Sequence, residues 1–180
     1  PVNAYGRTKL AGELAVQSSG CDYLIFRTSW VYASRANNFM LSMLKLAQER
    51  EELSIVSDQI GAPTSARLIA DVTLICIQQA HKERLVGIFS SDLYHLTSSG
   101  QTSWHGFTKE IAKLANNNLS IPLAIKSIKA IPTSDYPTPA KRPMNSRLAL
   151  TRLESIFGLT MPTWQDSLRR CMEEINTQTL

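Results

Sequence analysis

Two patterns of hydrophobic and polar positions alternate along the chain, one typical of helices and one typical of strands. Apolar residues recurring every three to four positions predict helices over residues 5–20, 36–51, 66–82, 102–118, 148–158 and 163–176. Continuous or alternating apolar runs predict strands over residues 22–32, 53–56, 87–100 and 123–131. Helices that alternate with strands in this order predict an α/β fold built around a layered sheet.

Turn-forming residues mark the ends of these elements. Gly20 ends the first predicted helix, and Asn37 or Asn38 caps the second, because Asn side chains accept hydrogen bonds from free N–H groups at helix starts. Residues 57–65 are rich in turn formers and predict a loop. Residues 132–146 contain four prolines, which exclude regular structure there.

Composition narrows the class of protein. The chain has 180 residues, of which 43% are hydrophobic and 19% charged, as is usual for a globular domain with a core of its own. No apolar run approaches the roughly 20 residues of a membrane span, so we expect no membrane partner. The net charge of +4 is scattered without a basic stripe, so we expect no nucleic-acid partner.

The cysteines and histidines predict neither disulfides nor a metal site. Cys21, Cys76 and Cys171 are widely spaced and form no CxxC pattern, so we expect free thiols in a reducing cytoplasm. The three histidines have no metal-ligand spacing with cysteines or carboxylates, and we therefore predict no metal.

Candidate chemistry begins near the start of the chain, where Tyr5 and Lys9 are four residues apart on one predicted helix. This spacing places both side chains on the same helix face. A phenol has a pKa of about 10, and a nearby cation lowers it towards values useful for acid–base catalysis. Taken alone, the pair favours two neighbouring surface side chains, because the spacing is common by chance.

The surrounding motifs strengthen the catalytic interpretation. The stretch Pro1-x-x-x-Tyr5-Gly6-x-Thr8-Lys9-x-x-Gly12-Glu13 is followed by "IFRTSWVYA", "NNF", "DQIGAPTSA" and "YPTPAKRPMNSRL". In this combination the chain resembles the extended short-chain dehydrogenases/reductases, from Tyr5 to about Leu148. The resemblance implies the C-terminal part of a doubly wound Rossmann-type sheet plus a small α/β substrate-binding domain.

The resemblance also implies a reaction and a cofactor. Tyr5 would protonate a ketone oxygen, and Lys9 would tune Tyr5 and hold the nicotinamide ribose of NADPH or NADH. No Gly-rich pyrophosphate loop follows a strand, and the Ser or Thr that completes the catalytic set in this family is not in the chain. We therefore expect these parts to lie outside this sequence. We assign residues 1–35 to the end of the dinucleotide-binding domain and residues 36–180 mainly to the substrate domain, with segments returning to the Rossmann sheet.

Further positions acquire predicted roles from the same resemblance. Arg27, Thr28 and Ser29 would lie near the nicotinamide amide, or they simply end a strand. Trp30 would touch the substrate, or it packs in the core. Asn38 would offer its amide to a diphosphate, or it only caps a helix.

The two predicted loops supply the remaining substrate-binding candidates. Gln59 and Thr64 lie in a segment that resembles the substrate loop of the family. Arg142 is the candidate phosphate ligand, because a guanidinium matches phosphate in a bidentate manner, and its alternative is a solvated loop residue. Asn145 would contact the same nucleotide or brace the loop.

The resemblance thus implies a reductase that acts on the C4 ketone of a dTDP-sugar, and we expect it to be cytoplasmic. Two alternatives remain open: an epimerase or dehydratase of the same family acting on a nucleotide sugar, and a non-catalytic regulatory subunit with the same fold. The intact Tyr5–Lys9 pair favours an enzyme. A homodimer is also left open.

Overall fold

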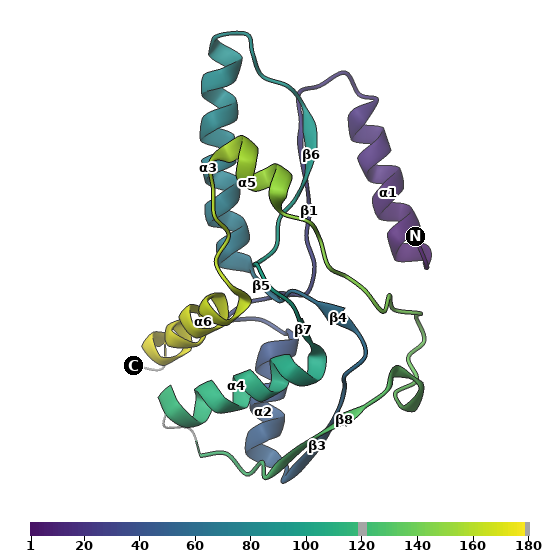
Figure 1. The fold of residues 1–180 in the computed structure, drawn as a ribbon, viewed down its shortest axis with the longest axis vertical. Helices are drawn as coiled ribbons and strands as arrows, with labels where there is room; N and C mark the ends of the chain where they lie inside the picture. Colours follow the sequence, from purple (N-terminus) through teal and green to yellow (C-terminus); the bar gives the residue numbers. More distant parts are fainter. Residues whose placement is uncertain (119–121, 179–180) are drawn as a thin grey trace.

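The computed structural model describes residues 1–118 and 122–178 and has an α/β fold (Figure 1). In chain order its elements are α1 (Ala4–Gln17), β1 (Leu24–Arg27), β2 (Val31–Tyr32), α2 (Phe39–Glu49), β3 (Glu52–Val56), β4 (Ile60–Gly61), β5 (Thr64–Ser65), α3 (Ala66–Leu85), β6 (Asp92–His95), β7 (Thr102–Ser103), α4 (Trp104–Asn118), β8 (Ser127–Ile131), the 3-10 turn η1 (Thr133–Asp135), α5 (Thr151–Phe157) and α6 (Trp164–Gln178).

The upper part of the molecule in Figure 1 is built on one parallel strand pair, β1 with β6. α3 and α5 lie on one side of this pair in the figure, and α1 lies on the other. Val72 and Cys76 of α3 pack with Tyr94 of β6 and with Leu153 and Phe157 of α5 in an apolar cluster. This layering of helices around parallel strands matches the predicted fold class.

The lower part holds a second apolar cluster and a second parallel pair, β3 with β8. Met40 and Leu44 of α2, Phe107 of α4 and Leu168 of α6 pack together around Tyr32. The chain passes between the two clusters repeatedly, because β1, α3, β6 and α5 belong to the upper part while α2, α4 and α6 belong to the lower part.

Most predicted helices are confirmed, and capping side chains explain where two of them begin. Asn38 is the N-cap of α2, where its side-chain oxygen accepts a hydrogen bond from the Leu41 N–H. Ser65 caps α3 in the same way through the Leu68 N–H. α1 ends at Gln17, slightly before Gly20.

Several strand predictions and one loop prediction needed correction, and the strand predicted over 123–131 is confirmed only from Ser127 to Ile131. The strand predicted over 22–32 is broken into β1 and β2, because the backbone at Trp30 turns into the left-handed region with a φ of 51°. The loop predicted over 57–65 contains β4 and β5, which pair with β7 and β2 from distant parts of the sequence. In the strand predicted over 87–100, the ladder extends only from Asp92 to His95.

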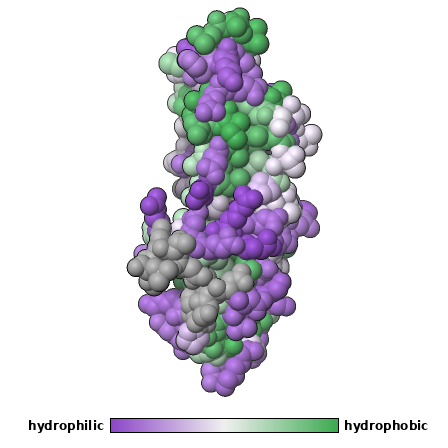
Figure 2. Space-filling view, turned by 90° about the vertical axis from the view of Figure 1, so that its left-hand side faces the viewer, coloured by the Kyte–Doolittle hydropathy of each residue, from purple (hydrophilic) through white to green (hydrophobic). Residues whose placement is uncertain are grey.

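The upper part also has a large exposed apolar surface. α1 contains no buried residue. α3 and the segment after it carry the exposed apolar side chains Leu74, Ile75, Ile77, Leu85, Val86 and Ile88. Figure 2 shows apolar atoms gathered at the upper end of the face that it displays. A surface of this kind is typical of a region that another part of a protein covers.

Candidate active site

Tyr5 and Lys9 lie one turn apart on α1, as predicted. Lys9 Nζ lies 5.7 Å from the centre of the Tyr5 ring. The Tyr5 side chain is 71% exposed, and its backbone carbonyl accepts a hydrogen bond from the Thr8 hydroxyl. The structure thus places an ammonium group near the ring of an accessible phenol on the same helix face, as the spacing predicted.

Arg27 ties the end of β1 to α1. Its Nε and Nη2 donate to the two carboxylate oxygens of Glu13, at 2.9 and 2.6 Å. The hydrogen bond from Arg27, strengthened by its charge, holds the pKa of Glu13 below its usual value. The Arg27 guanidinium thus holds Glu13 through two of its nitrogens, and the predicted cofactor contact of the Arg27 backbone stays a prediction.

Thr28 and Ser29 follow directly after β1. Thr28 is exposed, and Ser29 is half-buried. The Ser29 hydroxyl oxygen is buried and has no hydrogen-bond partner in the part of the chain that the structure describes. A buried hydroxyl without a partner is costly unless a ligand or water satisfies it, so this position suits contact with a bound group.

Trp30 is held in its unusual backbone conformation from three sides. Its indole stacks on that of Trp104, with ring centres 3.6 Å apart and planes 10° apart. Its carbonyl accepts a hydrogen bond from the Thr64 N–H. A Cβ on Gly61 would lie 2.6 Å from the Trp30 ring, so only glycine leaves room for this stack.

A groove of about 730 Å³ opens beside Trp104, between the lower cluster and the proline-rich loop. Its lining combines aromatic and apolar side chains with a few polar groups. The lining residues include Phe39, Gln59, Trp104, Tyr136 and Arg142.

Gln59 is buried at the edge of this groove and links its two walls. Its side-chain oxygen accepts a hydrogen bond from Trp104 Nε1, and its side-chain nitrogen donates to the Thr133 hydroxyl. The Thr133 hydroxyl and N–H in turn donate to the Asp58 carboxylate. The hydroxyl, more than the N–H, keeps the pKa of Asp58 below its usual value, so the carboxylate accepts both bonds at neutral pH.

Arg142 and Asn145 belong to the predicted irregular loop, and both are exposed. Arg142 lines the groove, as a ligand-binding side chain should. Asn145 accepts hydrogen bonds from the N–H and Nε of Arg147, and its backbone pairs with Ile60. The geometry of Asn145 therefore favours the loop-bracing alternative.

Two predicted substrate residues have structural roles instead. The Asn38 side-chain nitrogen donates to the carbonyls of Ala33, Arg35 and Ala36, while its oxygen caps α2. Thr64 is fully buried, and its hydroxyl donates to the Ala62 carbonyl and accepts from the Ser98 N–H. Protein atoms thus engage the polar groups of both side chains, which favours the capping alternative for Asn38, while a substrate contact of either residue stays a prediction.

The sequence reasoning missed Trp104 and the Asp58–Thr133 pair. Trp104 was placed inside a predicted helix, although an aromatic residue directly after the turn-rich stretch "TSSGQTS" was a usable signal. Asp58 and Thr133 are 75 residues apart, and no local pattern joins them.

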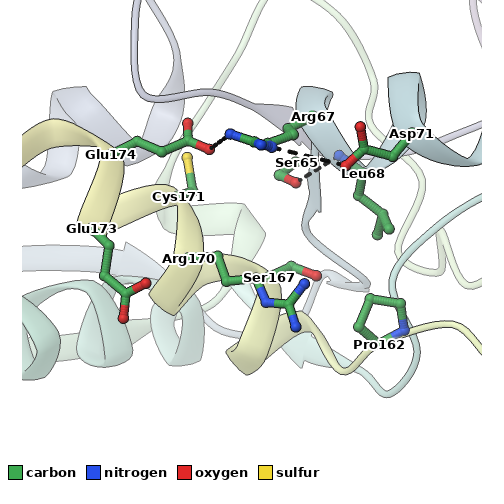
Figure 3. A pocket seen from close by; sticks show the side chains of 10 residues that line it. All are labelled: Ser65, Arg67, Leu68, Asp71, Pro162, Ser167, Arg170, Cys171, Glu173 and Glu174. Carbon is green, nitrogen blue, oxygen red and sulfur yellow. Dashed lines mark hydrogen bonds and ion pairs between the residues drawn. The ribbon is translucent and has the colours of Figure 1, made fainter. Parts of the chain in front are cut away.

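A second cavity of about 410 Å³ lies between α3 and α6 (Figure 3). Arg67 pairs there with Glu174, and also with Asp71 one turn along α3. Cys171 lines this cavity, and burial raises the pKa of its thiol to about 12, which makes it a poor nucleophile. Because Arg67 pairs with two of the carboxylates that line this cavity, Asp71 and Glu174, this cavity is not our candidate site.

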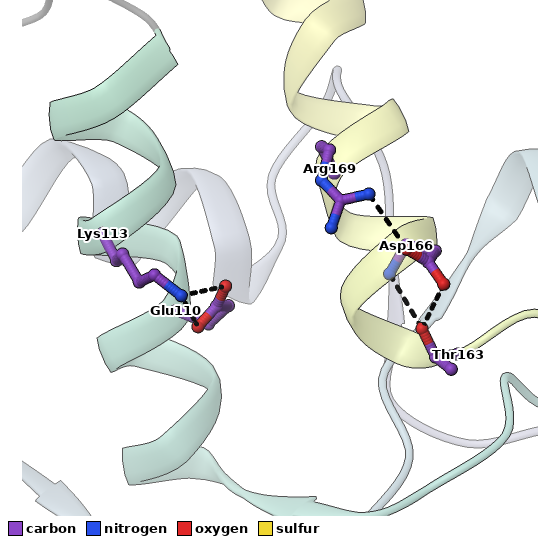
Figure 4. A network of polar contacts seen from close by, with 5 residues as sticks. All are labelled: Glu110, Lys113, Thr163, Asp166 and Arg169. Atoms are coloured by element: carbon purple, nitrogen blue, oxygen red, sulfur yellow. Dashed lines mark hydrogen bonds and ion pairs between the residues drawn. The ribbon is translucent and has the colours of Figure 1, made fainter.

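Figure 4 shows local polar contacts on α4 and α6. Lys113 pairs with Glu110 on α4, and Thr163 caps α6 by exchanging hydrogen bonds with Asp166. Among residues 1–118 and 122–178 there is no cluster of His, Cys, Asp and Glu that could hold a metal ion. No helix in the same ranges is long and apolar enough to cross a membrane.

The fold and the Tyr5–Lys9 helix define a class, the short-chain-reductase type of α/β protein, and comparison with known proteins makes this specific. The chain belongs to the RmlD substrate binding domain family, which it matches over residues 1–177. The resemblance and the α/β fold predicted from the sequence are confirmed at this level.

Among curated relatives, the chain is 51% identical to dTDP-4-dehydrorhamnose reductase from Burkholderia thailandensis, over 99% of this chain and 60% of the relative. It is 47% identical to the enzyme of that name from Escherichia coli, over 99% of this chain and 58% of the relative. The chain thus spans about three fifths of the length of the curated relatives it matches.

Solved structures give the same picture. The structure of a dTDP-4-dehydrorhamnose reductase from Clostridium acetobutylicum superposes with a TM-score of 0.84 at 34% identity, covering 97% of this chain and 56% of that one. The Bacillus anthracis enzyme, solved in complex with NADP, superposes with a TM-score of 0.78 at 34% identity, covering 97% and 56% of the two chains. A UDP-glucose 4-epimerase from Thermotoga maritima, at 13% identity, shares the fold alone.

Proposed function

We propose that the full-length protein reduces the C4 ketone of dTDP-4-dehydro-L-rhamnose to give dTDP-L-rhamnose, using NADPH or NADH. The observation that carries this proposal is the accessible Tyr5 phenol with the Lys9 ammonium over its ring, in a chain that is 51% identical to a reductase of this name. The same pair argues against a non-catalytic subunit, because a binding protein has no need of it.

Proton transfer is the part of the reaction that residues of this chain would perform. Tyr5 donates its phenolic proton to the ketone oxygen as charge develops there. Lys9 stabilises the resulting phenolate by its positive charge. The high exposure of Tyr5 leaves its hydroxyl free for substrate.

The cofactor would supply the hydride when bound, and the residues present fit it in part. Ser29 offers a buried hydroxyl without a protein partner close after β1, and Lys9 is exposed and free of ion pairs among the described residues. The carboxyl ends of parallel strands are where open α/β sheets bind such ligands. NADP in the Bacillus anthracis neighbour supports the same assignment. No Gly-rich pyrophosphate loop occurs in these 180 residues, so that contact would come from the rest of the protein.

The groove beside Trp104 would bind the nucleotide part of the substrate. Its aromatic lining, from Phe39, Trp104 and Tyr136, suits a planar base. Arg142 would pair with the diphosphate, since its guanidinium is exposed and has no ion pair within residues 1–118 and 122–178. Trp30, stacked behind Trp104, would shape the sugar end of the site.

We also propose the organisation of the complete protein. The upper cluster would complete a Rossmann sheet with the remaining two fifths of the chain, which would cover part of the exposed apolar surface of α3. The lower cluster would form the substrate domain. The three cysteines, Cys21, Cys76 and Cys171, are free thiols, which fits a protein located in the reducing cytoplasm. A homodimer stays a prediction, which light scattering of the full-length protein tests.

The deciding experiment is a reductase assay of the full-length protein. We expect oxidation of NADPH or NADH that depends on dTDP-4-dehydro-L-rhamnose and yields dTDP-L-rhamnose by NMR. A product with altered configuration but no net consumption of reduced cofactor would instead identify an epimerase.

A further inference from the structure

One side chain joins the start of the Tyr5 helix to the loop that carries Arg142. Asn3 is the N-cap of α1, and its side-chain oxygen accepts a hydrogen bond from the Gly6 N–H at 2.9 Å. Its side-chain nitrogen donates to the Lys141 carbonyl at 3.0 Å, across a sequence separation of 138 residues. Figure 1 shows the start of α1 beside this loop.

Each of the two contacts of the Asn3 side chain lies next to a residue of the proposed site. Tyr5 sits in the turn that Asn3 closes, between the cap and Gly6. Lys141 directly precedes Arg142, the proposed diphosphate ligand. A single amide group thus connects Lys141 to the first turn of α1.

Little else holds that turn in place. α1 has no buried residue, so packing contributes little to its position within this chain. In the described ranges, two side-chain ties connect α1 to other elements: Asn3 with Lys141 at its start, and Glu13 with Arg27 near its end. Tyr5 lies close to the first tie.

The loop is suited to transmit a ligand's position. Pro137, Pro139 and Pro143 restrict its backbone, so that fixing Arg142 also restricts Lys141. Tyr136 and Arg142 of this loop line the groove. Binding of a nucleotide in the groove would thus order the Lys141 carbonyl, which is the acceptor that Asn3 uses.

We propose that Asn3 is a positioning residue that couples occupation of the nucleotide groove to the placement of Tyr5. This inference rests on the proposed function and adds to it a residue that touches neither substrate nor cofactor. It predicts that the Asn3 amide donor, and not only its capping oxygen, is needed for full turnover.

Two variants separate these roles in the full-length protein. Asn3→Ser keeps a capping oxygen but is too short to reach Lys141, and Asn3→Asp keeps a strong cap but has no donor for the Lys141 carbonyl. A carboxylate at a helix start is also favourable with the helix dipole. If Asn3 were only a cap, both variants would keep the parent turnover, and Asn3→Asp would match the parent in stability.

We expect instead that both variants lower kcat by about two- to tenfold, the effect of one lost hydrogen bond, with little change in the dissociation constant for dTDP. Hydrogen exchange supplies a readout independent of turnover. In the parent, dTDP should slow exchange of the amides of residues 4–8, and in both variants this protection should be lost. Thr163→Ala is the matched control, since it removes the cap of α6 away from the site and should leave both readouts unchanged.

The outcomes are distinguishable. Parent-like kcat and dTDP-induced protection in Asn3→Ser and Asn3→Asp would overturn the coupling while leaving the reductase assignment intact. Failure of the parent protein to bind dTDP in calorimetry would overturn the proposed function, and this inference with it. Should Asn3→Ser unfold, Asn3→Asp decides alone, because its stronger cap protects the helix.

Discussion

Glu13 and Arg27 form a two-bond ion pair between the end of the Tyr5 helix and the end of β1, with distances of 2.6 and 2.9 Å. The Glu13 side chain is only 17% exposed, whereas that of Arg27 is 44% exposed. Because α1 has no buried residue, this pair and the Asn3 contact are its side-chain ties to the rest of the described chain. The pair thus links α1, which carries the proposed catalytic residues, to the strand end where the cofactor is proposed to bind.

Replacing Glu13 by Gln should lower the free energy of unfolding by up to about 1 kcal/mol at pH 7, a small value because Arg27 is partly solvated. The pKa of Glu13 is depressed in the folded state. Its stabilising effect is therefore present above the unfolded-state pKa and is lost as the pH falls through the folded-state pKa. Denaturant unfolding at pH 7 and at about pH 3 should show a difference between parent and variant that shrinks on acidification. Glu110→Gln, which breaks an exposed pair within one helix turn, is the control.

Replacing Tyr5 by Phe should reduce turnover of the full-length enzyme by about 10²–10⁴-fold, the usual contribution of general acid catalysis. Substrate affinity should change little, since the ring keeps its shape and only the hydroxyl is removed. A coupled assay of cofactor oxidation measures the first effect, and calorimetry with dTDP measures the second. Near-normal turnover would remove Tyr5 from the mechanism.

Replacing Gly61 by Ala should disturb the Trp30–Trp104 stack. The new Cβ would lie 2.6 Å from a rigid indole, so the ring must move. Overpacking of this kind costs about 1–3 kcal/mol. We expect a changed tryptophan fluorescence spectrum and weaker binding of substrate. Gly12→Ala is the matched control, because a Cβ there meets nothing within 4 Å, and in a helix it should stabilise by about 0.5–1 kcal/mol. An unchanged spectrum in Gly61→Ala would show that the stack tolerates the methyl group.

Replacing Arg142 by Ala should weaken dTDP binding by roughly 1.5–3 kcal/mol, the range for a hydrogen bond to a charged group. Cofactor affinity should be nearly unchanged, since the cofactor's phosphates are expected to contact another part of the protein. Arg142→Lys should restore only part of the loss, because an ammonium group keeps the charge but not the bidentate geometry. Calorimetry with dTDP provides the measurement, and Arg169→Ala on the outer face of α6 provides the control. Parent-like affinity in Arg142→Ala would make Arg142 a solvated loop residue.

Features that depend on neighbouring residues could be predicted from the sequence. The Tyr5–Lys9 pair follows from helix geometry, since four residues make about one turn. α2 begins where Asn38 predicted it, because capping is a contact between residues three apart. Residues 132–146 form no longer element than the three-residue turn η1, since proline constrains its own backbone whatever surrounds it. The family resemblance belongs to this group, because it rests on short motifs in a fixed order.

Features that depend on distant contacts were decided only by the tertiary structure. The residues around Trp30 favour one continuous strand, but the backbone at Trp30 interrupts it. Trp104, Gly61 and Thr64, which belong to other elements, hold Trp30 in this conformation. Asn38 and Thr64 matched motif positions of the family, yet their polar groups are satisfied by neighbouring protein atoms.

The site as a whole shows the same division. The Tyr5–Lys9 pair can be predicted from a few consecutive residues. The hydrogen bonds from Asn3 to Lys141 and from Thr133 to Asp58, in contrast, span 138 and 75 residues. Secondary structure and caps are short-range interactions that a pattern of side chains encodes directly. Long-range hydrogen bonds and stacking depend on how the elements pack, and the one-dimensional pattern does not specify that packing.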